Sequence, residues 1–316
     1  MRARRLTVCL LLLPLAVAAW VLNASRPGVR VRGCPEGCST AGVRQEGPLR
    51  VMSLNVLHGH PDFENLAGRL DTIAAEIRRL DADIVCLQEV PWTLRLGSGG
   101  QILAERTGLN HIGVRANGNR WAILFEEGEA ILSRYPLRDV AVSELSPRAG
   151  FFEHRVALRA TADTPWGDVR VFVAHLTDGE EEINRGQAAS LFAFVDASGP
   201  GLAVVAGDFN AREDSPQVRK LAGQWLDTYR VAHPDLDDEG YTCCVDNLAG
   251  GPGEPLEKRI DYLFLVPEPG RETPVVASRR VLDEPHPTGS GYQWASDHVG
   301  LLTFIAVQHD SATGGQ

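Results

Sequence analysis

Short apolar runs recur along the chain, and their spacing predicts a domain built mostly of strands. Runs of Val, Ile, Leu, Ala and Phe bounded by Gly, Pro or Asp are typical of strands covered on one or both faces. Runs with this pattern occupy residues 50–57, 83–90, 121–127, 129–137, 154–161, 168–176, 202–210, 259–266, 274–282 and 298–307. Helical spacing or a helix-start signal marks residues 65–83, 101–107, 182–197 and 215–223.

The order of these elements indicates the fold class. Strands dominate and helices separate them in a few places, which suits two mostly antiparallel sheets packed face to face with helices outside. We therefore expect an α/β fold, a four-layer α/β sandwich. The segment 233–257 is rich in Gly, Pro and Asp, and we expect it to be a long surface loop.

The N-terminal segment has the pattern of an export signal. Arg2, Arg4 and Arg5 precede an apolar run from Leu6 to Leu22. Small residues near its end suit cleavage, whereas its length also suits a membrane anchor. We expect residues 1–24 to be a signal peptide or N-terminal membrane anchor, 25–48 an extension, 49–308 the folded domain and 309–316 a disordered tail. The protein would then be exported, and be periplasmic, extracellular or anchored to the membrane.

Charge argues against a polyanionic partner. The 316-residue chain has a net charge of −10, although eight arginines lie within residues 1–50. Tight non-specific binding of nucleic acid depends on many Lys and Arg side chains that neutralise phosphates. We therefore do not expect such binding from the acidic remainder of the chain, which we expect to be a monomer.

Four of the six cysteines form two close pairs, Cys34 with Cys38 and Cys243 with Cys244. In an exported chain the first pair could form disulfides with the second pair and fasten the extension to the main domain. A local Cys34–Cys38 bridge is the alternative that the spacing leaves open. Cys86 lies in an apolar run and is expected to be a buried thiol.

Polar residues stand at the ends of several predicted strands. In "AGDFNA", alternation would point Asp208 and Asn210 the same way and turn Phe209 into the core. The full set is Asn55, Glu89, His175, Asp208, Asn210, Asp261, Asp297 and His298. Each has a structural alternative, such as a turn, a helix cap, or for Asp261 an ion pair with Arg259. Together they are the carboxylates, amides and imidazoles that a metal-assisted phosphate site requires.

At this point the sequence resembles the endonuclease/exonuclease/phosphatase superfamily, also called DNase I-like. The matching stretches are "SLNVLHG", "DIVCLQEV", "AILSRYPL", "VFVAHL", "NRGQ", "AGDFNA", "RIDYLFL" and "SDHVGL", in the family's order. The resemblance implies that residues 49–308 form the catalytic domain of a metal-dependent hydrolase of phosphodiesters or phosphomonoesters.

The resemblance also implies a metal site. Glu89 matches the family's metal-binding glutamate, Asn55 the asparagine beside the metal, and Asp297 an aspartate that contributes to the site or orients it. The expected ion is Mg²⁺, with Mn²⁺ as an alternative, since few carboxylates plus water suit magnesium.

Catalytic roles follow in the same way. Asp208 matches the residue that activates the attacking water, and Asn210 the one that orients it. His298 matches the phosphate-binding histidine and Asp261 its partner. His175 matches a second histidine that contacts the phosphate or protonates the leaving group.

Two departures bear on the substrate. The family's DNA-repair nucleases carry an acidic residue where this chain has Leu57, which disfavours a repair endonuclease. The neighbouring His58 and His60 could contact substrate or be solvated. With export and acidic charge, these features favour a lipid headgroup or a small periplasmic phosphoester. An exported endonuclease and a degenerate binding module remain as alternatives.

Overall fold

The fold is described from a computed structural model that covers residues 13–21, 26–28, 30–235, 239–268, 270, 275–289 and 291–307. The expected tail 309–316 and most of the expected export segment lie outside these residues. Residues 13–21 are helical. None of the helices formed by the described residues has the length and apolar character needed to cross a membrane.

The first large sheet gathers strands from both ends of the chain. Its main order is β1-β6-β7-β3-β2-β17-β14, and the short β4 and β5 join it beside β7. The strands are β1 (Arg32–Cys34), β2 (Leu49–Asn55), β3 (Ile84–Gln88), β4 (Trp92–Thr93), β5 (Gly97–Ser98), β6 (Asn110–Asn119), β7 (Phe125–Ser133), β14 (Val275–Val281) and β17 (Gly300–Ile305).

The second large sheet uses the middle of the chain. Its order is β12-β13-β11-β10-β9-β8. These strands are β8 (Leu137–Glu144), β9 (Val156–Thr164), β10 (Gly167–His175), β11 (Ala203–Asp208), β12 (Leu226–Asp227) and β13 (Asp261–Val266). A separate small hairpin joins β15 (His286–Thr288) to β16 (Gly291–Gln293).

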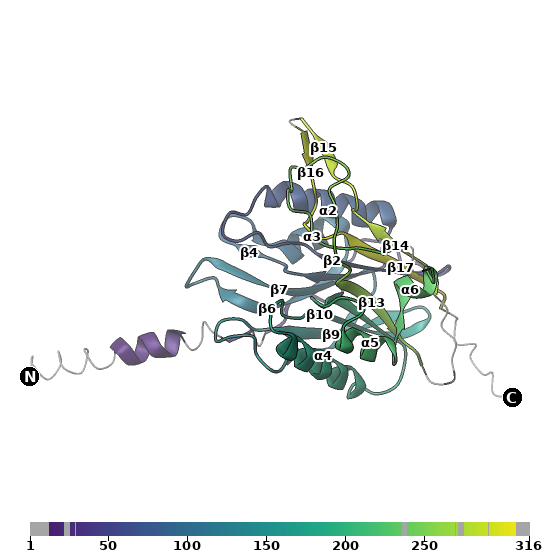
Figure 1. Ribbon diagram of the computed structural model, residues 1–316, viewed down its shortest axis with the longest axis horizontal. Coiled ribbons are helices and arrows are strands. Elements are labelled where there is room, and N and C mark those ends of the chain that lie inside the picture. Colours follow the sequence, from purple (N-terminus) through teal and green to yellow (C-terminus); the bar gives the residue numbers. More distant parts are fainter. Residues whose placement is uncertain are drawn as a thin grey trace, which may run out of the picture.

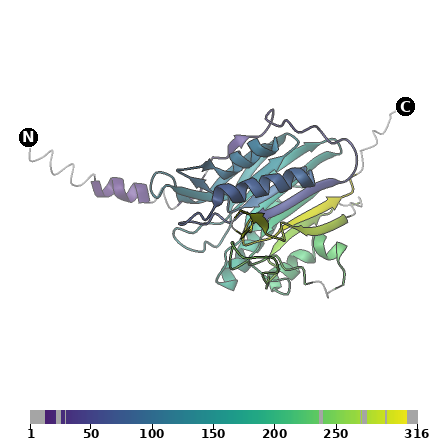
Figure 2. The same ribbon diagram turned by 90° about the horizontal axis from the view of Figure 1, so that it is seen from above.

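Helices cover the outer faces of both sheets, which confirms the predicted four-layer α/β sandwich (Figure 1). On the first sheet lie α2 (Leu66–Leu80) and α3 (Gly99–Thr107), and Figure 2 shows α2 running across it. On the second lie α4 (Glu181–Asp196) and α5 (Pro216–Ala222), while the short α6 (Thr228–Ala232) follows β12. One buried apolar cluster lies between the two sheets, and two others lie between each sheet and the helices that cover it. Both faces of both sheets are therefore buried, and this burial stabilises the sandwich.

Strand pairing decides which side chains can meet. β2 and β3 run parallel, with Asn55 opposite Gln88, so Asn55 and Glu89 emerge at one edge. β10 and β11 also run parallel, with His175 opposite Asp208, and β13 places Asp261 opposite Asp208. The polar residues at the ends of these apolar strands therefore lie at the carboxyl ends of the two parallel pairs, β2 with β3 and β10 with β11.

Two sequence-based expectations about elements are wrong. Residues 121–124 form a turn between β6 and β7 instead of starting a strand. The segment 233–257 is not simply a surface loop, because Thr242 and Cys243 are fully buried and Cys243 forms β-bridges with Lys258 and His298. Its backbone groups find partners in the interior, which removes the usual cost of burying a loop.

The cysteines pair locally. Cys34 joins Cys38, with their Cα atoms 6.1 Å apart, and Cys243 joins Cys244. The extension is therefore not fastened by disulfides to the 243–244 segment, contrary to the first hypothesis. It is held by β1 pairing with β6 and by the N–H groups of Thr40 and Ala41, which donate to the carbonyl of Gly108. Cys86 is a buried free thiol, as expected.

Candidate active site

Asn55 connects the two sheets at the predicted site. Its amide Nδ2 donates to Oε1 of Glu89 and to Oδ2 of Asp208, each at 3.1 Å. Its Oδ1 accepts the N–H of Leu57 at 3.0 Å, which fixes the direction of the amide. Because Glu89 follows a strand of the first sheet and Asp208 ends a strand of the second, this one side chain sets the spacing between them.

Asp208, Asn210 and His175 form the part of the site contributed by the second sheet. The N–H of Asn210 donates to Oδ1 of Asp208 at 2.8 Å. Nε2 of His175 lies 3.4 Å from Oδ2 of Asp208 and 3.0 Å from the amide nitrogen of Asn210. The predicted strand geometry does not continue to Asn210, which has φ +46°. A turn instead brings Asn210 beside Asp208, while Phe209 is fully buried, as expected.

His298 lies between two aspartates. Its Nδ1 is 2.8 Å from Oδ2 of Asp261, and its Nε2 is 3.7 Å from Oδ2 of Asp208. Arg259, the alternative partner of Asp261, instead binds Asp227 at 2.6 Å. Asp261 is therefore positioned to orient the imidazole.

Ser296 connects Asp297 to the backbone of Asn55 by hydrogen bonds. The hydroxyl of Ser296 donates to the carbonyl of Asn55 at 2.7 Å, and it lies 3.2 Å from Oδ1 of Asp297. Burial raises the pKa of Asp297, and the negative charge of Glu89 raises it further. Two carboxylates that repel each other in a half-buried site fit a divalent cation, and their oxygens with that of Asn55 are the hard ligands that Mg²⁺ prefers.

A second set of potential ligand atoms comes from Asp208, Asp261 and His298, within 4.8 Å of one another. In this set the protonated imidazole of His298 supplies the positive charge between the two aspartates. Burial lowers the pKa of His298, but the charges of Asp261 and Asp208 outweigh burial and raise it well above its usual value. A protonated imidazole has no lone pair to give to a metal, so this set could hold a metal ion only after His298 loses its proton.

The pKa values of the other two groups are also displaced. Burial, with repulsion from Asp261, raises the pKa of Asp208 to about 7. Burial and the nearby positive charge of Arg155 lower the pKa of His175 well below its usual value, so this imidazole is neutral. Because Arg155 can only donate, its contact with Nδ1 at 2.9 Å leaves the proton of His175 on Nε2, facing Asp208.

Several residues that shape the site escaped the sequence analysis. Arg69 on α2 is fully buried and donates to the carbonyls of Val56, Leu57 and Ala295, which ties the loop after β2 to the segment before Asp297. Its position on the apolar face of a predicted amphipathic helix was the available signal. Arg155, at the start of a predicted strand, offered none.

Two buried glutamates on β7 were also missed. Burial raises the pKa of Glu127 to about 7. Burial and the neighbouring Glu127 raise the pKa of Glu129 well above its usual value, and one carboxyl oxygen of Glu129 has no hydrogen-bond partner. The run "EEGEA" looks like a solvated surface in the sequence, yet Glu127 and Glu129 are buried, and the nearby charge of Glu89 contributes to raising the pKa of both.

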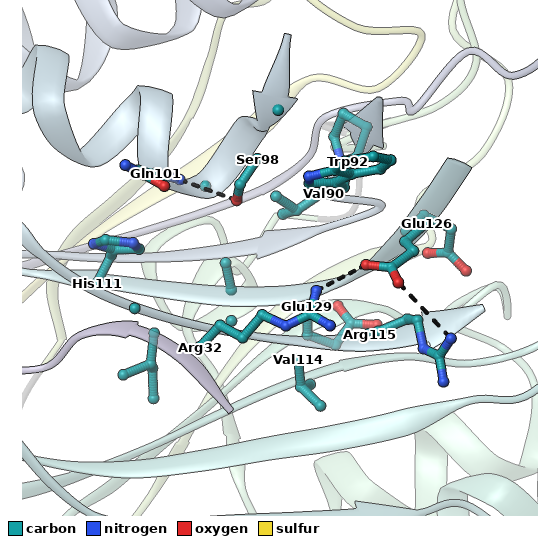
Figure 3. Close-up of a pocket in the computed structure, with 18 of the residues that line it drawn as sticks. Arg32, Val90, Trp92, Ser98, Gln101, His111, Val114, Arg115, Glu126 and Glu129 are labelled. Atoms are coloured by element: carbon teal, nitrogen blue, oxygen red, sulfur yellow. Dashed lines mark hydrogen bonds and ion pairs between the residues drawn. The ribbon is translucent and has the colours of Figure 1, made fainter. Parts of the chain in front are cut away.

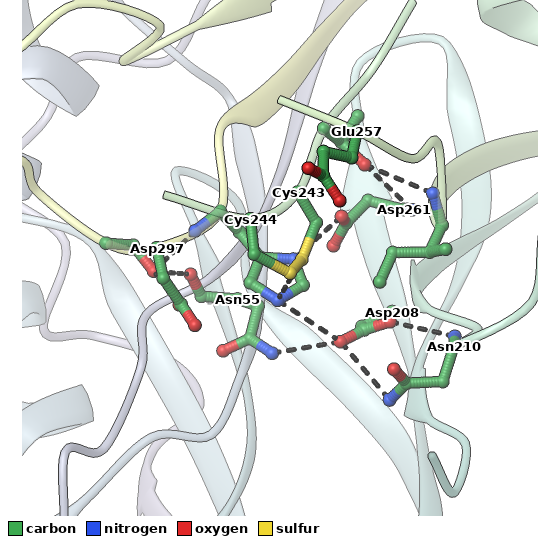
Figure 4. The surroundings of a disulfide bond; sticks show 12 residues. Asn55, Asp208, Asn210, Cys243, Cys244, Glu257, Asp261 and Asp297 are labelled. Atoms are coloured by element: carbon green, nitrogen blue, oxygen red, sulfur yellow. Dashed lines mark hydrogen bonds and ion pairs between the residues drawn. A yellow bond between two sulfur atoms is a disulfide. The ribbon is translucent and has the colours of Figure 1, made fainter. Parts of the chain in front are cut away.

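The Cys243–Cys244 disulfide borders the site (Figure 4). Sγ of Cys243 lies 3.5 Å from Nε2 of His298. The N–H of Val299 donates to the carbonyl of Thr242, and that of Val245 donates to the carbonyl of Asp297, both at 2.8 Å. The segment around the disulfide therefore holds the backbone that carries Asp297 and His298.

A cavity of about 490 Å³ is lined by residues of β1, β6 and β7 together with Val90, Trp92 and Ser98 (Figure 3). None of the predicted site residues lines it. Glu126 on its wall meets Arg32 at 2.8 Å and Arg120 at 2.6 Å. Glu127 and Glu129 belong to the same wall, as does Val90, which follows Glu89 directly.

The model of the Endonuclease/Exonuclease/phosphatase family matches residues 52–298, a span that includes every residue of the site described above. The chain belongs to this family. Members are metal-dependent hydrolases of phosphate esters, and this protein is therefore an enzyme of that class. No curated protein matches the sequence.

Solved structures share the fold. An endonuclease/exonuclease/phosphatase from Beutenbergia cavernae is 26% identical with a TM-score of 0.59, covering 83% of this chain and 72% of that one. A mannosyl-6-phosphatase from Bacteroides thetaiotaomicron is 18% identical with a TM-score of 0.65, covering 82% and 99%. A humanized TDP2 from D. rerio is 16% identical with a TM-score of 0.64, covering 83% and 100%.

Proposed function

We propose that this family member is an exported, Mg²⁺-dependent phosphoesterase that hydrolyses a lipid headgroup or another small phosphate ester by in-line attack of water. The observation that carries the proposal is that Asn55 donates hydrogen bonds to both Glu89 and Asp208, while the imidazole of His298 lies 3.7 Å from the carboxylate of Asp208. Export is supported by the apolar run that follows the N-terminal arginines.

The chain's own residues divide the chemistry. The carboxylate of Asp208 accepts a proton from the attacking water, which the amide of Asn210 orients. Protonated His298 donates to a non-bridging oxygen of the phosphate, where negative charge develops. Neutral His175 donates its Nε2 proton to the phosphate or the leaving oxygen.

The metal would be held by Glu89, Asn55 and Asp297. When bound, Mg²⁺ supplies a positive charge that polarises the phosphoryl oxygen. The pairing of Asn55 with both Glu89 and Asp208 keeps the metal side and the base at a fixed separation.

The decisive experiment compares the wild-type protein with Asp208→Asn, which keeps the size of the side chain and removes the base. Each is assayed with Mg²⁺, Mn²⁺ or EDTA on phospholipid vesicles, sphingomyelin, a bis-aryl phosphodiester, a sugar phosphate and supercoiled plasmid. We expect metal-dependent turnover that falls by at least about 100-fold in Asp208→Asn, typical of losing a general base.

The substrate panel separates the alternatives. Turnover confined to plasmid would make the protein an exported endonuclease, and equal turnover by wild type and Asp208→Asn would overturn the mechanism. No metal-dependent turnover of any substrate by a folded wild-type protein would favour a binding module.

A further inference from the structure

Six large apolar side chains stand exposed at three neighbouring loop tips. They are Leu94 (68% exposed), Trp121 (84%), Ile123 (55%), Leu124 (50%), Phe151 (56%) and Phe152 (63%). We call these six residues the apolar rim. Other exposed apolar side chains of the described domain, such as Val140, Leu226 and Val276, stand on separate strands. Apolar side chains gathered this way are unusual on a free surface and mark a binding face.

Pairing between strands brings the three tips together. Thr93 of β4 lies opposite Phe125 at the start of β7, which places Leu94 beside the β6–β7 turn that carries Trp121. The loop before β9 is joined to β6 by two hydrogen bonds. The N–H of His154 donates to Oδ1 of Asn117 at 2.7 Å, and Nδ2 of Asn117 donates to the carbonyl of His154 at 3.0 Å.

The apolar rim borders the active site on two sides. The ring of Phe125, next to Leu124, lies 5.0 Å from that of His58, and Nε2 of His58 lies 3.5 Å from Oε2 of Glu89. On the other side, Arg155 follows the Phe151–Phe152 loop by three residues and contacts His175 at 2.9 Å. A flat surface touching the rim would therefore lie across the mouth of the site.

The chain arriving from the N-terminal apolar segment reaches the same place. The N–H of Gly28 donates to the carbonyl of Arg115 at 2.8 Å. Gly28, Arg30 and Trp121 line one small cavity of about 210 Å³. Both views show the N-terminal helix at the end of the molecule from which the β6–β7 hairpin projects (Figures 1 and 2).

Basic side chains accompany the rim on this side. Arg26, Arg30 and Arg95 are exposed, and Arg120 precedes Trp121. Guanidinium groups beside exposed aromatic rings match the headgroup layer of an anionic bilayer, where Trp side chains also concentrate.

We propose that the apolar rim is a docking surface for a lipid bilayer, which presents the phosphate of a membrane lipid to the active site. This inference rests on the proposed phosphoesterase function and adds to it the physical state of the substrate. The apolar side chains of the rim would enter the interface between water and lipid. The nearby arginines would supply positive charge complementary to the lipid phosphates. The apolar segment at residues 6–22 would hold the same end of the protein near the membrane.

Fluorescence quenching tests docking without relying on activity. The full chain is mixed with vesicles of phosphatidylglycerol and phosphatidylcholine whose acyl chains carry bromine, and compared with a Trp121→Phe variant. We expect the Trp121 contribution, obtained as the difference between the two proteins, to be quenched by brominated and not by ordinary vesicles. An unquenched Trp121 would overturn the proposal.

Activity provides the second test. The variant Trp121→Ser/Phe151→Ser/Phe152→Ser should turn over vesicle phospholipid at least about tenfold more slowly, because it loses three apolar contacts with the bilayer. Its turnover of the soluble bis-aryl phosphodiester should be unchanged. The matched control Val140→Ser/Leu226→Ser/Val276→Ser removes exposed apolar groups elsewhere and should behave like wild type on both substrates.

The outcomes separate the two proposals. Equal turnover of vesicle lipid by the rim variant and wild type, with Asp208-dependent cleavage of the soluble diester, would reject docking and keep the enzyme. Quenching of Trp121 in a protein that cleaves nothing would keep docking and reject the enzyme. Rim-dependent self-association without quenching would assign the rim to protein contacts and overturn the proposal.

Discussion

Cys243 Sγ lies 3.5 Å from Nε2 of His298, so a disulfide forms the wall of the site beside this imidazole. The contact is buried, because Cys243 is 0% and His298 6% exposed. The sulfur fills space beside the imidazole on the side away from Asp261. Removing it would give the ring freedom to move.

We therefore predict that Cys243→Ala/Cys244→Ala lowers kcat/KM on the soluble diester by about tenfold, equivalent to about 1.4 kcal/mol of transition-state stabilisation. The control Cys34→Ala/Cys38→Ala removes the other disulfide, which lies on β1 and the extension, and should retain wild-type kcat/KM. Steady-state kinetics with thermal unfolding of each variant makes the comparison. Equal kinetics for the two double variants would rule out a role for the disulfide at His298.

The pH dependence of the rate should follow two displaced groups. Asp208 acts as a base only when deprotonated, and its pKa is raised to about 7. We predict that kcat/KM falls by about tenfold per pH unit below that value. His298 acts as a donor only when protonated, and its raised pKa places the loss of activity on the alkaline side. A rate that does not change from mildly acidic to neutral pH would contradict this assignment.

Asp261→Asn tests the coupling behind that profile. Asp261 raises the pKa of both Asp208 and His298 by its negative charge. Its removal should move both limbs of the profile to lower pH, by about one unit or more for a charge in contact. If the maximum rate changed while the acid and alkaline limbs of the profile stayed at the same pH, Asp261 would act only by orienting His298 and not by its charge.

Gly207 allows the close approach of β10 and β11. A Cβ at this position would lie 1.9 Å from the carbonyl oxygen of Ala174. We predict that Gly207→Ala pushes the strands apart, lowers the free energy of unfolding by about 1–3 kcal/mol, and reduces activity by separating His175 from Asp208. Gly42→Ala meets no atom within 4 Å and serves as the control in denaturant unfolding and kinetics. Equal stability of the two variants would show that the strands adjust without cost.

Glu129 should make the protein less stable as pH rises. Its folded pKa lies well above the usual value, so the folded state keeps a proton that the unfolded chain releases. The unfolded state then binds fewer protons above pH about 4.5, and the free energy of unfolding falls with pH until the folded pKa is reached. Glu129→Gln removes this dependence.

We predict that Glu129→Gln is more stable than wild type, by about 1.4 kcal/mol for each unit by which the folded pKa is raised. The difference should vanish near pH about 4 and grow toward alkaline pH. Urea unfolding in EDTA across this range measures it. A difference that does not depend on pH would indicate that Glu129 is ionised in the fold.

Much of the site could be predicted because its residues follow apolar runs. Asn55, Glu89, His175 and Asp208 each end a strand or follow one directly, and parallel pairing brings such ends to one edge. The helix over 65–83 was predictable from Leu and Ile at helical spacing. These features depend on periodicity, which the sequence displays directly.

The features that could not be predicted depend on tertiary contacts. β6 reads NHIGVRANGN, whose Asn and Gly residues disguise a strand paired on both sides. Residues 121–124 are as apolar as a strand, yet Trp121, Ile123 and Leu124 are exposed, because hydropathy alone does not distinguish a buried strand from an exposed apolar turn. Arg69 and Glu129 are charged and buried, and only the folded chain shows the carbonyls or neighbouring carboxylates around them.

The division of the site between the two sheets has a further consequence. Glu89 directly follows a strand of one sheet and Asp208 ends a strand of the other, and the apolar layer between the sheets keeps them in register. A slip of one sheet past the other by a single residue would preserve most of the secondary structure and abolish the chemistry. Circular dichroism would not detect such a species. The catalytic rate per molecule therefore measures the fraction of chains in which the two sheets have packed in the correct register.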